Sequence, residues 1–203
     1  MRRRWLALAA PLVVSACGYN TIQTYDEQAS AAKQQIEVQL QRRADLIPNL
    51  VATVKGQAGQ ELQVFTQVAQ ARAGLLGALQ KGDPREMANA NDQLTGAMRG
   101  LMVAVEAYPQ LKSDQAFLRL QDELTGTENR IAVSRNDYNG AVQQFNTYIR
   151  NFPAVLTAKV TGAKAREYFE VTNPGARETP KVDFGAPNPG PVVMPPPAES
   201  NKP

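Results

Sequence analysis

Histidine is absent from this 203-residue chain, and cysteine occurs once, at position 17. Without histidine there is no imidazole base, no Ser/His/Asp or Cys/His relay, and no usual nitrogen ligand for zinc or haem. The sequence also has no glycine-rich phosphate loop, no G-x-S-x-G motif and no carboxylates spaced for a metal site. We therefore expect a protein that is not an enzyme and that has no cofactor and no metal.

The single cysteine ends a pattern that is typical of bacterial lipoprotein signals. Residues 2–4 are arginines, residues 5–14 are mostly apolar, and small residues at 15 and 16 precede Cys17. We predict cleavage after residue 16 and attachment to a membrane through acyl chains on Cys17. An uncleaved anchor is the alternative, although the uncharged run 5–17 rises only about 20 Å as a helix and a hydrocarbon core is about 30 Å thick.

Removal of the predicted signal would neutralise the chain. The full sequence has 22 basic and 19 acidic residues, and loss of the three arginines leaves 19 of each. A neutral chain lacks the basic field that attracts nucleic acid, and no basic run interleaved with aromatic residues occurs. We therefore expect no nucleic-acid partner.

The chain divides by composition into a signal (1–16), one domain (17–171) and a tail (172–203). Nine of the 14 prolines lie in the tail. Such a segment lacks backbone donors and buries too little apolar surface to fold, so we predict that the tail is disordered. A spacer, or a ligand for an aromatic groove, is the alternative interpretation.

Apolar residues in the domain recur at steps of three and four, which is the period of an amphipathic helix. The pattern predicts four helices, over residues 22–40, 47–79, 84–108 and 114–152. The connections are short, and no alternating strand pattern lies between the helices. We therefore predict an all-α fold, an antiparallel up-and-down four-helix bundle followed by the proline-rich tail.

Turn residues indicate where these helices begin and end. Gly82 suits a helix end, Asp83 suits the cap of the next helix, and Pro84 suits its first position. Pro48 lies inside an apolar pattern, where a proline costs about 3 kcal/mol. That cost disappears if Asp45 is a cap and Pro48 lies in the first turn. We therefore predict that the first two helices divide near Asp45; one long kinked helix is the alternative.

Three charged residues occupy positions where an apolar stripe would continue: Arg72 on the second predicted helix, and Glu128 and Arg135 on the fourth. Because an unpaired buried charge costs several kcal/mol, we predict that Glu128 pairs with at least one of the two arginines. Breaking a buried pair would cost about 3 kcal/mol or more. We favour an ion pair that fixes helix register over a polar ligand site inside the bundle.

A series of motifs spans most of the chain. These are residues 40–51 (LQRRADLIPNLV), 54–56 (VKG), 71–72 (AR), 108–112 (YPQLK), Phe117 with 120–121 (LQ), 128–132 (ENRIA), Arg135 with 138–139 (YN), Asn146, 152–153 (FP) and 168–170 (YFE). Taken in this order, they resemble the LemA family. The resemblance implies an up-and-down four-helix bundle, tethered by its N-terminus to the bacterial envelope, without enzyme activity. Many family members have a longer apolar anchor, so the VSAC run at residues 14–17 favours lipid attachment here.

One motif offers a candidate docking edge for a partner. It consists of Leu46, Ile47, Pro48 and Asn49. The segment forms either a turn between two helices or an exposed edge. We favour the turn, because Pro48 and an Asp45 cap account for it without a partner.

Two asparagines, Asn139 and Asn146, lie seven residues apart and each follows an aromatic residue. This spacing places both amides on one edge of the helix. They either bond to a neighbouring element or line a site, and the residues leave both interpretations open.

The sequence predicts a non-catalytic, lipid-anchored envelope protein that acts as a scaffold or interaction module, with another envelope protein as its partner. Gly18 after the cysteine resembles lipoproteins sent to the outer membrane, where the chain would face the periplasm in an organism that has one. The alternative is a bundle that binds a small ligand or peptide through Arg72, Glu128 and Arg135. A pocket beside these charges would favour that alternative.

Overall fold

The computed structural model describes the backbone of residues 2–58 and 63–171, and the side chains of 18–56 and 63–171. Within these residues the chain forms six helices and no strand, so the predicted all-α class is confirmed. The predicted proline-rich tail, residues 172–203, lies outside the described residues.

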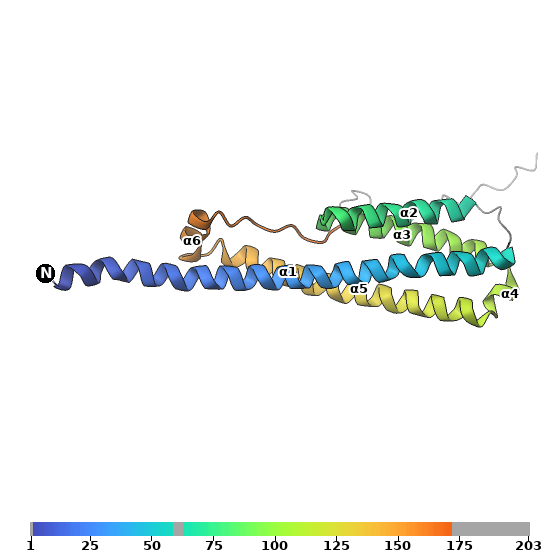
Figure 1. The fold of residues 1–203 in the computed structure, drawn as a ribbon, viewed down its shortest axis with the longest axis horizontal. Helices are drawn as coiled ribbons and strands as arrows, with labels where there is room; N and C mark the ends of the chain where they lie inside the picture. Colours follow the sequence, from blue (N-terminus) through green and yellow to red (C-terminus); the bar gives the residue numbers. More distant parts are fainter. Residues whose placement is uncertain (1, 59–62, 172–203) are drawn as a thin grey trace, which may run out of the picture. The chain divides into compact units, whose positions relative to one another are not determined.

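The helices are α1 (Arg2–Ala58), α2 (Gln63–Lys81), α3 (Pro84–Val105), α4 (Pro109–Lys112), α5 (Gln115–Tyr148) and α6 (Ala154–Thr161). Figure 1 shows α1, α2, α3 and α5 running alternately in opposite directions, with α5 beside α1 and α3 beside α2. The short α4 joins α3 to α5, and α6 packs against α1. The long helices are therefore arranged as an up-and-down bundle, but α2 and α3 have only 19 and 22 residues, against 57 and 34 in α1 and α5.

The first helix is longer than predicted. α1 continues through Asp45 and Pro48 and ends at Ala58, so the predicted division near Asp45 was wrong and the single long helix is correct. Asp45 caps no helix, and its Oδ1 accepts a hydrogen bond from Gln41 Nε2 at 2.9 Å. Apolar residues on both sides of Pro48 are fully buried, and a break near Asp45 would interrupt that buried face.

The other predicted caps are confirmed. Gly82 has a φ of +67°, in the left-handed region that favours glycine, at the end of α2. Asp83 Oδ1 accepts the backbone N–H groups of Arg85 and Glu86 at 2.8 and 2.9 Å. The sequence left Ser113 and Asp114 open as the start of the last long helix, and Asp114 caps α5 in the same way. These carboxylates satisfy N–H groups that have no partner inside their helices.

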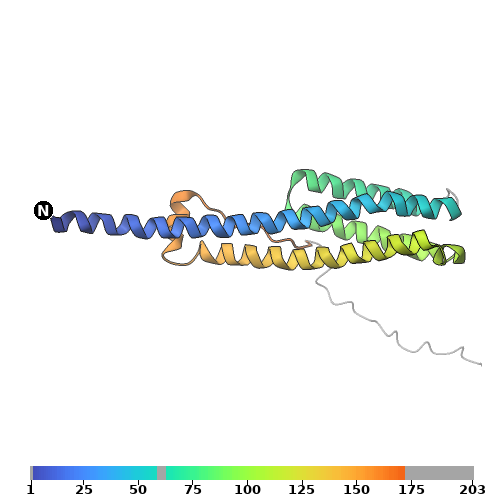
Figure 2. The same ribbon diagram turned by 60° about the horizontal axis from the view of Figure 1, so that its bottom comes forward.

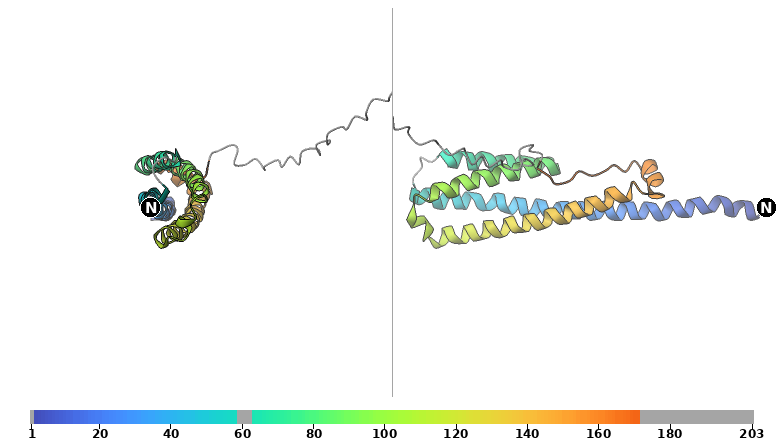
Figure 3. Two further views of the ribbon diagram at one scale, coloured as in Figure 1. Left: turned by 90° about the vertical axis from the view of Figure 1, so that its right-hand side faces the viewer. Right: turned by 180° about the vertical axis from the view of Figure 1, so that it is seen from behind.

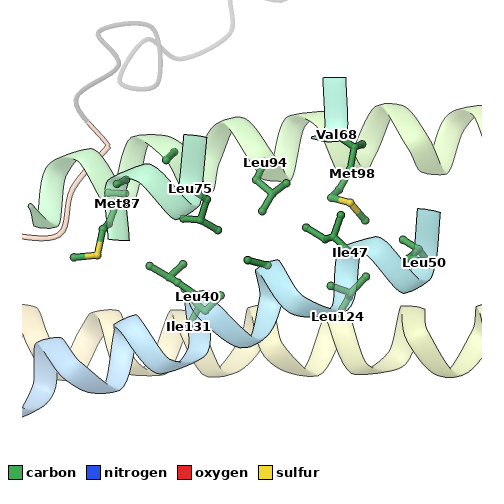
Figure 4. Close-up of a cluster of buried hydrophobic side chains, with 14 of the residues drawn as sticks. Leu40, Ile47, Leu50, Val68, Leu75, Met87, Leu94, Met98, Leu124 and Ile131 are labelled. Carbon is green, nitrogen blue, oxygen red and sulfur yellow. The ribbon is translucent and has the colours of Figure 1, made fainter. Parts of the chain in front are cut away.

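The main core lies where all four long helices meet, which we call the four-helix region (α2, α3 and the parts of α1 and α5 that pack on them). Figure 4 shows its side chains pointing toward one another from these four helices. The labelled residues are Leu40, Ile47, Leu50, Val68, Leu75, Met87, Leu94, Met98, Leu124 and Ile131. All are buried, as expected for the apolar stripes of amphipathic helices.

α1 and α5 extend beyond the ends of α2 and α3, and there a different part of the chain covers them. We call residues 163–171, which follow α6 and form no regular secondary structure, the strap. Figures 2 and 3 show the strap extended and running back along the bundle. The strap region comprises α6, the strap and the parts of α1 and α5 that contact them. A second, smaller apolar cluster of Ile22, Phe145, Ile149 and Ala158 lies in it.

Candidate functional site

Cys17, the predicted lipidation site, belongs to α1, and its side chain lies outside the described residues. Within residues 2–58 and 63–171, none of the helices contains an apolar stretch of the length needed to cross a membrane. Lipid attachment at Cys17 stays a prediction.

The three charged residues predicted to meet in the core do not come together. Arg135 is exposed on α5, and Glu128 is also exposed. The salt bridge of Glu128 is with Arg43 of α1, at 3.7 Å between Oε2 and Nη2, so the prediction of Arg72 or Arg135 as its partner was wrong. Positions 128 and 135 lie at the border of the buried apolar face of α5, where their charged groups reach water.

Arg72 instead forms a hydrogen bond with the backbone of α1. Proline has no N–H, so Pro48 leaves the carbonyl of Ala44, four residues earlier, without its helical donor. Ala44 is fully buried, where an unmet carbonyl would be costly. Arg72 Nε of α2 donates to this oxygen at 2.7 Å. An arginine from the neighbouring helix therefore takes the place of the missing N–H and allows α1 to continue through Pro48.

The candidate docking edge at residues 46–49 is helical, so the favoured interpretation as a turn was wrong. Ile47 is buried in the core, Leu46 is half-buried, and Pro48 and Asn49 are exposed. Leu46 and Asn49 line a shallow groove that also includes Val38 of α1 and Leu79 of α2. The exposed part of this edge is therefore a helix surface beside a groove.

The most deeply buried charge among the described side chains is Arg43 of α1, which is 3% exposed. Its Nη1 donates to Asn91 Oδ1 of α3 at 2.6 Å, and its Nη2 lies 3.7 Å from Glu128 of α5. Its Nε is buried and has no hydrogen-bond partner. Burial lowers the pKa of the Arg43 guanidinium, and the Glu128 carboxylate acts in the opposite direction. Arg43 thus links three helices and keeps one donor unused.

A cleft of about 270 Å³ opens at Arg43 between α1, α3 and α5. Its lining combines apolar and polar side chains, namely Arg43, Thr95, Met98, Arg99, Met102, Gln121, Leu124, Thr125 and Glu128. Two guanidinium groups, two hydroxyls and one amide give this cleft several hydrogen-bond donors. Glu128 is the sole carboxylate in the lining, so the cleft favours an anionic or polar guest.

Sequence reasoning missed Arg43, although a signal for it existed. Position 43 continues the apolar stripe between Leu40 and Ile47 at steps of three and four. The adjacent Ala44 fits the same spacing, so the apolar pattern appears uninterrupted and Arg43 does not stand out. The criterion that selected Glu128 also selects Arg43 once both border positions of a helix face are considered.

The two asparagines of α5 hold the backbone of the strap. Asn146 Nδ2 donates to the Arg166 carbonyl at 2.9 Å, and the Arg166 N–H donates to Asn146 Oδ1 at 2.8 Å. Asn139 forms the same pair with Phe169, at 3.3 and 2.9 Å. Seven helical residues rise about 10.5 Å and three extended residues span about 10 Å, so the two spacings match. The asparagines bond to a neighbouring element, which was one of the two predicted alternatives.

Further contacts fasten the strap between the two asparagine pairs. Tyr138 Oη donates to the Glu167 carbonyl at 2.7 Å, and burial raises the pKa of Tyr138 to about 12. The Arg166 guanidinium pairs with Asp26 of α1 at 2.8 Å and lies over the Phe145 ring. The hydrogen bond to Asp26 raises the pKa of Arg166. The strap is therefore bound to both α1 and α5.

Among the side chains that the structure places, no group of three or more histidine, cysteine, aspartate or glutamate residues has the geometry of a metal site. The polar motif residues Arg72, Asn139 and Asn146 bind backbone atoms of the same chain. Their arrangement stabilises the fold, whereas in the Arg43 cleft a buried guanidinium lies beside open space.

Comparison with known proteins identifies relatives. The model of the LemA family matches residues 32–184. Magnetosome protein MamQ 2 of Paramagnetospirillum magneticum is 29% identical over 188 residues, which cover 81% of this chain and 69% of that protein. Magnetosome protein MamQ of Magnetospirillum gryphiswaldense is 28% identical over 187 residues, with the same two coverages.

A more distant relative carries the family's name. Protein LemA of Metamycoplasma hominis is 25% identical over 118 residues, which cover 58% of this chain and 52% of that protein. The family match spans α2, α3, α4, α5, α6 and the strap together with the later part of α1. It therefore includes the Arg43 cleft, the Arg72 contact and both asparagine pairs.

Proposed function

Because this chain belongs to the LemA family, we propose that it is a non-catalytic interaction module of the cell envelope, anchored to a membrane through acyl chains on Cys17. The observation that carries the proposal is the use of the polar motif residues. Arg72, Asn139 and Asn146 are committed to backbone atoms of their own chain. Side chains used in this way hold a scaffold together and are not free to act on a substrate.

The relatives support a role within a larger structure of the cell. Two of them are named as magnetosome proteins, and they align with 81% of this chain. A bundle that is tethered at its N-terminus and presents its helices to the surroundings suits such a role. Gly18 after Cys17 favours the outer membrane, with the bundle facing the periplasm.

The docking edge for an envelope protein is the exposed surface of α1 at Pro48 and Asn49. The groove beside it includes exposed Val38 and half-buried Leu46, so it offers apolar contact within a polar rim. Interfaces commonly combine an apolar centre with such a rim. Because α1 is one continuous helix through this edge, a partner would meet a rigid surface.

Metabolic labelling with a fatty acid tests the anchor. The wild-type chain should carry label and fractionate with membranes, and Cys17→Ala should lose the label. An unlabelled wild-type chain that stays in the membrane would contradict lipid attachment and favour an uncleaved anchor.

Photo-crosslinking tests the docking edge. A photoreactive amino acid in place of Asn49 should capture one protein of defined mass in intact cells. The same amino acid in place of Asn129, which is exposed on α5, is the matched control and should not capture it. Equal capture at both positions, or none at Asn49, would argue against this edge.

The Arg43 cleft supports a second candidate function, the binding of a small anion. Arg43 is buried with an unpartnered Nε, and Arg99 lies in the same lining. Guanidinium groups are the usual partners of carboxylate and phosphate groups, because their N–H groups form two parallel hydrogen bonds. This site replaces the predicted set of Arg72, Glu128 and Arg135, of which only Glu128 lines the cleft.

Thermal melts of the full chain test this candidate with inorganic phosphate and citrate as probes. Either anion should raise the melting temperature above that in chloride at equal ionic strength. The increase should be lost in Arg43→Met and kept in Arg135→Met, because Arg135 lies outside the cleft. An increase that is equal in both variants would indicate a general salt effect.

A further inference from the structure

The short helix α6 exposes an apolar face that the bundle does not use. Ala154 and Ala158 are buried, and Ala158 belongs to the cluster of the strap region. Phe152, Leu156 and Val160 are 82%, 57% and 88% exposed. Leu156 and Val160 are spaced four apart in α6, so they lie on one side of the helix, opposite the two alanines. Phe152 lies in the turn just before the helix.

Exposed large apolar residues concentrate at this place. Eight such residues occur among the described side chains, and three of them are Phe152, Leu156 and Val160. A fourth is Tyr19, which lies next to Gly18 on α1. Single exposed apolar residues are ordinary on protein surfaces, but a contiguous group marks a surface that contacts something apolar.

The position of α6 places this group beside the anchor. A Cβ atom at Gly18 would lie 3.3 Å from Thr157 Oγ1, so α6 packs closely on α1 at that residue. Gly18 is the residue directly after Cys17. Figures 1 and 2 both show α6 lying across α1 at this level. A helix that lies across the anchored helix runs along the membrane surface when the anchored helix stands upright.

The charged residues that flank α6 in the sequence are of one sign. No acidic residue occurs between Asp137 and Glu167, whereas Arg150, Lys159 and Lys164 lie in that stretch and are exposed. Apolar side chains flanked by basic residues are typical of helices that lie in the interface of an anionic membrane.

A second protein is a poorer fit for this face. Stable protein interfaces bury about 800 Å² on each partner. Two apolar side chains on a helix of eight residues, with a third in the turn before it, are too few to form the centre of such an interface. A membrane surface has no such requirement here, because the anchor already holds α6 at the membrane.

We propose that the exposed face of α6 docks on an anionic membrane surface, with Phe152, Leu156 and Val160 among the lipids and the basic residues at the phosphates. The proposal rests on the proposed membrane anchoring, and it is independent of whether that anchor is acyl chains or an uncleaved segment. α6 would act as a second contact that fixes the orientation of the bundle above the membrane.

Tryptophan fluorescence of the full chain tests the proposal. The background variant is Trp5→Phe, because Trp5 is the single tryptophan of the sequence. Leu156→Trp and Val160→Trp are then reconstituted separately in vesicles of phosphatidylethanolamine and phosphatidylglycerol with brominated acyl chains. Both should show emission shifted to shorter wavelength and loss of intensity to the brominated lipid. Val133→Trp, 61% exposed on α5, is the control and should be quenched by acrylamide from the water.

The charge component is tested in the same vesicles. Lys159→Glu with Lys164→Glu should restore the emission of Leu156→Trp toward that of the control, whereas Lys112→Glu on α4 should not. Quenching of positions 156 and 160 by acrylamide alone, without quenching by lipid, would overturn the proposal. Fatty-acid labelling of the same samples tests the anchor separately. A protein whose fluorescence is quenched by lipid but which carries no fatty-acid label would contradict lipidation and still support the α6 contact.

Discussion

The two regions of this bundle close the same pair of helices in different ways. In the four-helix region, α2 and α3 bury aliphatic side chains against α1 and α5. In the strap region, an extended segment covers α1 and α5, and it is held by asparagine and tyrosine side chains that bind its backbone. A helix satisfies its own backbone groups, but an extended segment does not, so α5 has to supply partners for it.

This difference predicts different kinds of stability. Aliphatic burial involves four helices at once and should set the global free energy of unfolding. Hydrogen bonds to one segment of nine residues concern mainly that segment, and its opening need not unfold the bundle. Substitutions in the two regions should therefore separate global from local effects.

The largest effect is expected in the core of the four-helix region. Leu94 is fully buried on α3, and Leu94→Ala should lower the free energy of unfolding by about 2–5 kcal/mol because it leaves a cavity. Val103→Ala on the same helix is the control; Val103 is 63% exposed, and the change should cost less than about 0.5 kcal/mol. Denaturant melts measure both. Equal midpoints would mean that the interior around Leu94 is not closely packed.

A double-mutant cycle in the same region tests the contact between Arg72 and the backbone of α1. Arg72→Met should cost about 1.5–3 kcal/mol, because it removes a charged donor from the buried carbonyl of Ala44. In a Pro48→Ala background, position 48 has its N–H again and the same change should cost less. Equal costs in the two backgrounds would show that Arg72 acts independently of the proline.

Asn146→Ala sharpens the comparison, because its effect should stay in the strap. The change removes both hydrogen bonds to Arg166 and should cost about 1–3 kcal/mol locally. Hydrogen exchange of the Arg166 amide should accelerate, whereas amides of α3 should keep their protection. Gln144→Ala, at an exposed position two residues earlier, is the control. Equal acceleration in α3 would mean that the strap and the core open together.

The sequence predicted the helices better than the contacts between them. The apolar period and the cap at Asp83 are local signals, and they are confirmed. The division near Asp45 was wrong because the donor that compensates Pro48 comes from Arg72, 28 residues away from Ala44. No local pattern shows such a contact.

The candidate site was predicted less well for the same reason. Glu128 was selected because it interrupts an apolar stripe, but its partner Arg43 lies 85 residues earlier in the sequence, on another helix. Arg43 was overlooked because the adjacent Ala44 also fits the apolar pattern of its helix. Asn139 and Asn146 were recognised as a pair with two alternatives open. Their partner is backbone, which any sequence offers, so residue types alone do not identify the strap.

High pH should weaken the strap through Tyr138. Its folded pKa of about 12 is above the ordinary value of about 10, so folding favours the protonated hydroxyl. This contribution is complete below about pH 10 and is lost as the pH rises toward 12. Tyr138→Phe should cost about 1 kcal/mol at neutral pH and should flatten the decline above pH 10. Melts between pH 8 and about 12, with exposed Tyr19→Phe as the control, measure this. Parallel declines in wild type and Tyr138→Phe would assign the effect to other groups.

The smallest effect is expected at Glu128, where a buried ion pair would have given a loss of about 3 kcal/mol. The Glu128 side chain is 53% exposed and lies 3.7 Å from Arg43, so water and salt screen the attraction. Glu128→Ala should therefore cost less than about 1 kcal/mol. The loss should shrink further at high salt. Asn91→Ala should cost more, about 1.5–3 kcal/mol, because Asn91 accepts the short hydrogen bond of the buried guanidinium. A larger loss for Glu128→Ala than for Asn91→Ala would mean that the carboxylate, and not the amide, stabilises Arg43 inside the bundle.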